Sequence, residues 1–249
     1  MAKNSEETIY ERVVNEDNRR AVFQRKCIAF VFFCALGIGL SFIKLPIPFT
    51  PKILSVEFSY IAVLLVAFTV HPLAGVAISV IKSAAVCIFI PSFVPSAVNK
   101  ILVEVVSVLI TYWLFKVTVR SRMLEKAEQK HVAKGKGKID KVLPSLALSG
   151  LLGTVVSGAV TVLSVSYVLY PLQLRLSSVS SEEVLGYYQV AYGGLTRLLP
   201  FLTGLFPSMD SILVGAIVYN GPMTAAKCLF CALLLLAFYK PLNHLINEP

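Results

Sequence analysis

Charged residues are scarce in this chain. They make up 15% of its 249 residues, whereas roughly 25% is usual in a soluble domain. Hydrophobic residues account for 56%, and the mean hydropathy is +0.76. This composition excludes an ordinary soluble domain and predicts an integral membrane protein. The net charge of +9 does not indicate nucleic-acid binding, because the basic residues cluster beside apolar runs and no base-reading motif is present.

Catalytic motifs are also absent from the sequence. There is no HExxH, no GxSxG and no paired acidic motif, so we expect no enzyme, no catalytic residue and no cofactor. Without a GxxxxGK[ST] loop, the chain is not expected to use ATP by itself. Cys228 and Cys231 form a CxxC, but no second pair and no nearby histidine complete a metal set. We therefore predict buried thiols and no metal site.

Long apolar runs, by contrast, are abundant. A membrane-spanning helix needs about 20 apolar residues, and these runs are too long and too continuous for the strands of a barrel. The sequence therefore predicts an all-α integral membrane protein with six transmembrane helices. A tight hairpin at His71-Pro72 separates the second and third, and Pro222 is expected in the first turn of the last. The predicted spans are 27–43, 53–70, 72–90, 96–119, 144–170 and 222–241.

Basic residues predict how the spans are oriented. They crowd the N-terminal segment 1–26 and the loop 120–143, and cytoplasmic loops carry such an excess. With six spans, these two segments and both termini lie in the cytoplasm of a multi-pass cell-membrane protein. The first span follows a long mixed-charge segment rather than the short basic start of a signal peptide, so we expect it to be retained. The predicted division is a cytoplasmic segment 1–26 and a membrane domain 27–249.

Two segments predicted to lie outside are unusual. The strip 44–52, KLPIPFTPK, holds three prolines, which restrict its conformations. In the long segment 171–221, the sequence Ser180-Ser-Glu-Glu183 is a capping box that predicts a helix start. Residues 198–220 are apolar but interrupted by prolines and glycines, which predicts a partly re-entrant segment. The outer half of the membrane domain is therefore expected to enclose a cavity.

Five ionisable residues fall inside or beside the predicted spans, where charge is costly. Lys100 and Glu104 are one helical turn apart, which favours a structural ion pair. Lys82 lies mid-span and is expected to face a partner or a cavity. Lys227, about 7.5 Å below the outer end at 1.5 Å per residue, suits the floor of an outward pocket or a snorkelling anchor. The fifth is Glu57.

Small residues four apart let helices approach closely. Ala35 and Gly39 have this spacing in the first span. Similar series occur in the third and fifth spans, and ordinary packing inside the bundle is the favoured explanation for any one of the three series. The third-span series is Gly75, Ser79 and Ser83, and the fifth-span series is Ser149, Gly153 and Ser157.

Four stretches in order resemble one family. IPFTPKILSVEFSYIAVLL (47–65) resembles its proline-rich first loop and the start of helix two, and HPLAGVAISVIKSAA (71–85) its "GPlaG…lIKN" helix three. VSYVLYPL (165–172) resembles its "NYFxxLPxY", and GPMTAAK (221–227) its "PFNxxK". The family is the substrate-binding S components of energy-coupling-factor (ECF) vitamin transporters, most closely the riboflavin type. Serine and threonine replace the motif asparagines at Ser166 and Thr224, and the segment 171–221 is longer than expected.

This resemblance implies a function. Such a subunit captures a small vitamin outside, and a transmembrane coupling subunit with two cytoplasmic ATPases drives uptake across the lipid bilayer. Domain 27–249 would bind the substrate, with the strip 44–52 as a lid and Ala35 and Gly39 contacting the coupling subunit. The implied substrate-binding residues are Phe49, Leu54, Glu57, Lys82, Ser166, Tyr167, Thr224 and Lys227.

Three alternatives stay open at this stage. The chain could bind another vitamin. It could also be a stand-alone carrier coupled to protons or sodium, using Glu57 or Glu104 with Lys82. The absence of an obvious inverted repeat favours the importer subunit over the carrier. An intramembrane enzyme has no supporting motif.

Overall fold

The chain is all helical in the computed structural model, which describes residues 2–45, 50–51, 57–90, 94–129, 142–176 and 180–247. No β-strand forms within these ranges. Two five-residue π-helical turns, η3 and η4, interrupt the helices. The elements are α1 (Ala2–Phe42), α2 (Tyr60–Thr69), α3 (Pro72–Phe89), α4 (Val94–Gln129), α5 (Val142–Ser164), η3 (Val165–Leu169), α6 (Tyr170–Leu176), α7 (Ser181–Leu198), α8 (Leu202–Leu205), α9 (Ile212–Gly215), η4 (Ala216–Asn220) and α10 (Gly221–Asn247).

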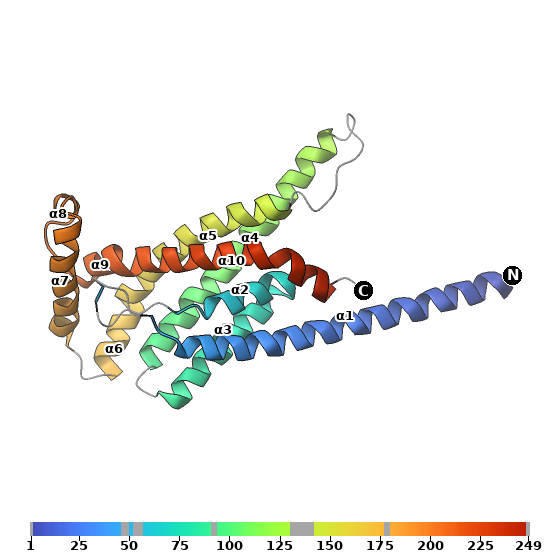
Figure 1. The fold of residues 1–249 in the computed structure, drawn as a ribbon, viewed down its shortest axis with the longest axis horizontal. Coiled ribbons are helices and arrows are strands. Elements are labelled where there is room, and N and C mark those ends of the chain that lie inside the picture. The colour runs from blue at the N-terminus through green and yellow to red at the C-terminus, as the bar shows by residue number, and fades with distance from the viewer. Residues whose placement is uncertain are drawn as a thin grey trace.

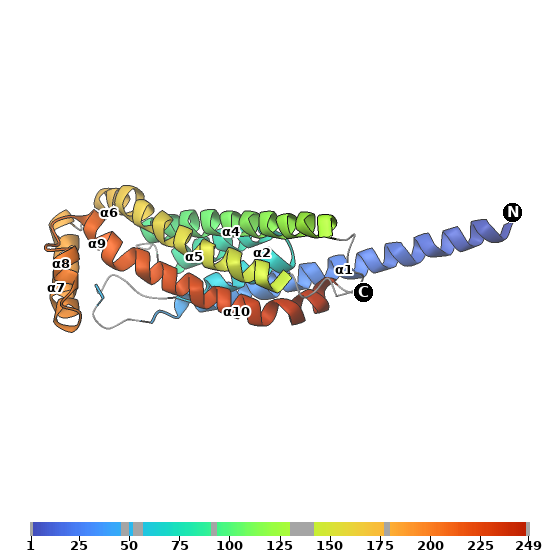
Figure 2. The same cartoon turned by 90° about the horizontal axis from the view of Figure 1, so that it is seen from above.

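The long helices run side by side as an elongated bundle, while α7 crosses one end of it (Figures 1 and 2). The C-terminus lies at the opposite end, where the N-terminal half of α1 projects beyond the other helices. Five helical stretches in the described part of the chain are long and apolar enough to cross a membrane. They are Glu16–Phe42, Pro72–Phe89, Val94–Val119, Leu143–Leu176 and Ile212–Asn247.

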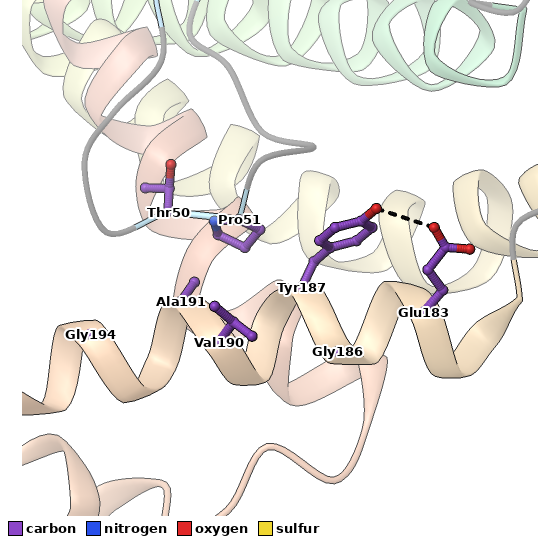
Figure 3. A pocket seen from close by; sticks show the side chains of 8 residues that line it. All are labelled: Thr50, Pro51, Glu183, Gly186, Tyr187, Val190, Ala191 and Gly194. Atoms are coloured by element: carbon purple, nitrogen blue, oxygen red, sulfur yellow. Dashed lines mark hydrogen bonds between the residues drawn. The ribbon is translucent and has the colours of Figure 1, made fainter.

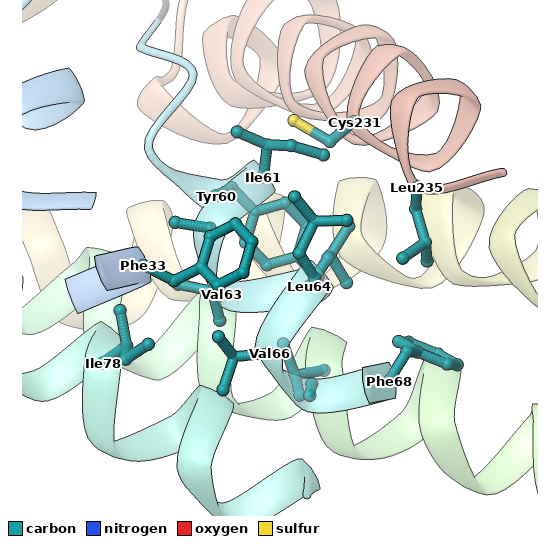
Figure 4. Close-up of a cluster of buried hydrophobic side chains, with 14 of the residues drawn as sticks. Phe33, Tyr60, Ile61, Val63, Leu64, Val66, Phe68, Ile78, Cys231 and Leu235 are labelled. Carbon is teal, nitrogen blue, oxygen red and sulfur yellow. The ribbon is translucent and has the colours of Figure 1, made fainter. Parts of the chain in front are cut away.

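The second predicted span is shorter than expected. Helix α2 covers Tyr60–Thr69 only, and Glu57 and Phe58 before it are not helical. All ten α2 residues are buried, as suits a helix that is apolar on every side. Figure 4 shows its side chains meeting those of α1, α3 and α10, including Phe33, Ile78 and Leu235. A helix of ten residues is about 15 Å long, so α2 forms the centre of the core and does not cross a bilayer alone.

The predicted hairpin between α2 and α3 is confirmed. His71 caps α3 by accepting a hydrogen bond from the Leu73 N–H on Nδ1 at 3.3 Å, and Pro72 follows in the first turn. A Cβ on Gly75 would lie 2.8 Å from the Val63 carbonyl oxygen and 2.7 Å from the Ala67 Cβ. Because Gly75 has no side chain, the backbone of α3 can approach α2 closely at this position.

Pro222 lies in the first turn of α10, as predicted, but the continuous helical stretch starts earlier in the chain. The helical stretch begins at Ile212, after the Ser211 side chain caps it, and Pro222 lies inside. Turn η4 comes just before this proline, and the Gly221 N–H bonds to the Ala216 carbonyl five residues back. The wider turn changes the backbone pairing ahead of a residue that has no N–H, so the helix continues.

A π-turn also precedes a proline in the fifth predicted span. Turn η3 precedes Pro171, and the Tyr170 N–H bonds to the Val165 carbonyl. The helical stretch consequently runs on to Leu176, beyond the predicted end at residue 170. The two π-turns lie at the same end of the bundle as α7 (Figure 1).

Helix α7 starts where the capping box predicts. The Ser180 Oγ accepts a hydrogen bond from the Glu183 N–H at 3.1 Å. Tyr188 is fully buried in a second core, separate from that around α2, and its ring fills the space above Gly215. A Cβ at Gly215 would come within 2.7 Å of the Tyr188 ring, so glycine makes this contact possible.

Candidate substrate-binding site

An ion pair lies deep between α3 and α4. The Lys82 Nζ is 2.7 Å from Glu104 Oε1, and the two residues are 1% and 4% exposed. Lys82 also donates to Ser59 Oγ at 2.6 Å, and Ser79 donates to Glu104 Oε2 at 2.6 Å. Buried charges are tolerated when they are paired and hydrogen-bonded in this way. Lys82 thus faces a partner, as its mid-span position predicts.

A second ion pair joins Lys100 on α4 to Glu57, just before α2. The predicted pairing of Lys100 with Glu104 is therefore wrong. Residues four apart on one helix can pair, but Glu104 is held across the helix interface by Lys82. Lys100 is the more accessible partner of its pair, with 24% of its side chain exposed against 5% for Glu57.

Lys227 completes a group that we call the ion cluster, comprising Glu57, Lys82, Lys100, Glu104 and Lys227. Its Nζ lies 5.8 Å from the centroid of the Tyr60 ring. It is close enough to Lys82, Lys100 and Glu104 to interact electrostatically with each. The cluster holds three lysines and two glutamates, so it carries one excess positive charge when all are ionised. Thr224, half-buried, lies three residues earlier on the same face of α10.

A cavity of about 610 Å³ lies between Thr50-Pro51 and one face of α7 (Figure 3). Its α7 wall is contributed by Glu183, Gly186, Tyr187, Val190, Ala191 and Gly194. The Tyr187 hydroxyl donates to Glu183 Oε1 at 3.1 Å, and this hydrogen bond raises the pKa of Tyr187. The phenol therefore remains a donor at neutral pH. The cavity falls in the size range of pockets for small organic ligands, about 300–1,000 Å³.

Tyrosine hydroxyls link α6, α7 and η4. The Tyr170 and Tyr188 hydroxyls are 2.5 Å apart, and Tyr188 donates to Asn220 Oδ1 at 2.6 Å. Burial raises the pKa of Tyr188 to about 12, so its proton is retained. Within the described part of the chain, the buried Ser166 Oγ and Tyr219 hydroxyl have no hydrogen-bond partner.

The other predicted site residues are placed as follows. Tyr167, on η3, is 70% exposed and is not brought together with the ion cluster. Ser166, its neighbour, turns its hydroxyl inward. Ala35 and Gly39 lie on an exposed face of α1, and a Cβ on Gly39 would meet nothing within 4 Å. Phe49 and Leu54 lie outside the described residues.

Three residues at these sites were not predicted from the sequence. Tyr60 was not singled out, although it is the first residue of α2 and underlies Lys227. Glu183 was predicted only as part of the helix start, and neither Glu183 nor Tyr187 was predicted to line a cavity. With Val190 and Gly194 they form a series spaced by four, three and four residues, which marks one helix face and could have indicated a common surface.

Together these groups can bind a polar organic molecule but offer no obvious chemistry for changing it. The ion cluster suits carbonyl or anionic acceptors, and the cavity beside α7 is mainly apolar. Among the residues that the structure describes, no group of three or more His, Cys, Asp or Glu side chains is arranged to hold a metal ion.

A solved protein structure has a similar fold. It is described as "Structure and mechanism of the S component of a bacterial ECF transporter". The TM-score is 0.54 at 20% sequence identity, covering 90% of this chain and 99% of the other. The chain thus has the fold of an S component, as the sequence motifs predict.

A second similarity lies in the sequence. A stretch of 59 residues is 37% identical to the riboflavin transporter RibU of Staphylococcus aureus (strain TCH60). This match covers 24% of the chain and spans 31% of the relative's length. No protein-family model matches the sequence. Both similar proteins are described as transport proteins, which agrees with the prediction that the chain is not an enzyme.

Proposed function

We propose that this protein is the substrate-binding S component of an ATP-driven ECF importer, and that it captures a small vitamin, riboflavin being the best candidate. The observation that carries the proposal is the S-component fold, shared over 90% of the chain. The ion cluster and the cavity beside α7 give this fold a polar and an apolar surface with which to hold a ligand.

Riboflavin is favoured by the partial match to a riboflavin transporter. Its flat ring system carries carbonyl oxygens, and the excess positive charge of the ion cluster suits such acceptors. Lys227 and Thr224 share the α10 face that would meet them. Because Ser166 and Thr224 stand where the family motifs have asparagine, another vitamin with a planar ring is the alternative substrate.

The proposed topology has six membrane crossings, the second made by α2 together with the non-helical residues 57–59 before it. Both termini and the loop 120–143 then lie in the cytoplasm. Figure 1 supports it, because the C-terminus and the projecting half of α1 lie at the end opposite α7. Segments 44–52 and 171–221 would then lie outside, the first as a lid and the second partly re-entrant. The described ends of the strip, Lys44-Leu45 and Thr50-Pro51, do not form helix.

The proposed partners are a transmembrane coupling subunit and two cytoplasmic ATPases. Helix α1 offers the coupling subunit an exposed small-residue face at Ala35 and Gly39. A partner helix could approach the backbone there, because a Cβ on Gly39 would meet nothing within 4 Å in this chain.

The stand-alone carrier is the competing function. It requires Glu57 or Glu104 to bind and release a proton or sodium ion, yet each carboxylate is engaged by a lysine. Such pairing favours a structural role and therefore the importer subunit.

Uptake and binding measurements test the proposal. The purified chain should carry or bind a vitamin, detected for riboflavin by its absorbance and by mass spectrometry. Uptake in cells should require the ATPase and coupling subunits. Transport by the chain alone in liposomes, driven by an ion gradient, would replace the importer subunit with the carrier.

A further inference from the structure

Helix α7 is fixed firmly at the end of the bundle. Tyr188 is buried against Gly215 and donates to Asn220 at 2.6 Å. The next residue, Gln189, donates to the Met209 carbonyl at 3.2 Å, and one turn further Tyr192 donates to the Leu202 carbonyl at 3.1 Å. These anchors hold one side of α7, and they leave another face turned toward Thr50 and Pro51 (Figure 3).

That free face has the properties of a binding wall. Gly186 contributes no side chain, and a Cβ built there would meet nothing within 4 Å, so the cavity is open beside the Tyr187 ring. The hydrogen bond from Tyr187 to Glu183 orients the ring. Thr50 and the buried Pro51 line the cavity beside this face of α7. An oriented tyrosine ring beside a mainly apolar space suits a planar aromatic ligand.

We propose that this face of α7 is the outer wall of the substrate site, with Tyr187 contacting the planar ring of the ligand and Glu183 accepting a hydrogen bond from a ligand hydroxyl or amine. The inference rests on the proposed function and deepens it, because it assigns two specificity-determining residues to the segment 171–221. Among the described residues that line the cavity, Glu183 is the carboxylate, and it disfavours an anionic group there. The preferred ligand therefore presents a neutral or cationic donor to Glu183 on α7.

Titration of the purified full chain with two probes tests this assignment. The first is riboflavin, and the second is lumiflavin, which has the same ring but a methyl group in place of the hydroxylated chain. Gly186→Leu fills the cavity and should weaken binding of both by about ten-fold or more. Tyr187→Leu should weaken both by about three- to ten-fold through loss of the stacked ring. Glu183→Ala should weaken riboflavin more than lumiflavin.

Gly193→Leu is the matched control. Gly193 is also on α7, a Cβ there also meets nothing within 4 Å, and it is not among the residues that line the cavity. It should bind both probes as the unmodified chain does, which shows that a leucine on α7 is tolerated.

The outcomes separate this inference from the proposed function. If the unmodified chain binds riboflavin and Gly186→Leu and Tyr187→Leu bind it equally well, the α7 wall is wrong and the proposed function stands. If these variants bind riboflavin more slowly but with an unchanged Kd, the ligand passes through the cavity without being held there. That result would likewise overturn the inference. If the unmodified chain binds neither probe, riboflavin is not the substrate and the assignment of the α7 face is also wrong.

Discussion

The Lys227 ammonium on α10 lies over the ring of Tyr60, with Nζ 5.8 Å from the ring centroid. Tyr60 is the first residue of α2 and is 2% exposed, so the contact joins the last helix to the buried helix at the centre of the core. A cation–π contact of this kind does not use a hydrogen-bond acceptor, so the ammonium can still donate to a ligand. The relationship supports Lys227 as the residue that meets the polar edge of a ligand.

Lys227→Met should therefore weaken vitamin binding. Leaving a buried ligand acceptor unpaired costs about 1–3 kcal/mol, or roughly ten- to hundred-fold in Kd. A fluorescence titration of the purified variant with riboflavin measures the effect. Lys240→Met, at an exposed position on the same helix, is the control and should leave Kd unchanged. Equal affinities for the two variants would remove Lys227 from the site.

Lys82→Met should destabilise the fold. It leaves the Glu104 carboxylate buried without its cation, which costs about 3–5 kcal/mol. Thermal unfolding in detergent should show a lowered Tm, and the double variant Lys82→Met/Glu104→Gln should recover most of it because no lone charge remains. A double variant as unstable as the single one would argue against the ion pair.

Gly75→Ala should also destabilise the protein, although alanine is the better helix former. Its Cβ would lie 2.8 Å from the Val63 carbonyl oxygen, and backbone there cannot move aside without shifting α2. Overpacking of this kind costs about 1–3 kcal/mol. Gly193→Ala, which meets nothing within 4 Å, should be neutral or stabilising in the same unfolding measurement. The opposite ranking would contradict the close approach of α2 and α3.

Gly39→Trp should separate capture from transport. The exposed position accepts a large ring without a clash inside this chain, so riboflavin binding should be near normal. Filling the contact with the coupling subunit should abolish co-purification of the partners and uptake in cells. Val155→Trp, at an exposed apolar site on α5, is the matched control and should retain uptake. If cells carrying Gly39→Trp still take up the vitamin, the proposed contact with the coupling subunit is wrong.

Cysteine labelling tests the topology. In a cysteine-free background, Lys130→Cys should react with a membrane-impermeant reagent only after the cells are opened. Glu182→Cys, exposed near the start of α7, should react in intact cells. The expectation follows from the basic residues of 120–143 and from the even number of proposed crossings. Labelling of both sites from outside would reject the six-crossing arrangement.

Local features of this protein could be predicted because they depend on neighbours in the chain. The apolar runs indicated helices, since a segment in lipid must satisfy its backbone hydrogen bonds within itself. His71-Pro72 and Ser180 marked helix starts correctly, because a capping side chain bonds to an N–H only two or three residues away. The mid-span Lys82 was expected to face a partner or a cavity, because an unpaired charge at that depth is too costly.

The choice of partners, however, depended on how the helices rotate and meet. Glu104 could pair with Lys100 one turn away or with Lys82 across an interface, and only the packing of α3 on α4 selected Lys82. Pro222 was a plausible helix start until a π-turn let the helix run through it. The cavity wall on α7 depends on Tyr188 locking above Gly215, a contact between residues 27 positions apart that no local pattern encodes. Side-chain partnerships of this kind follow from tertiary packing, because periodicity indicates which residues share a face but not what that face meets.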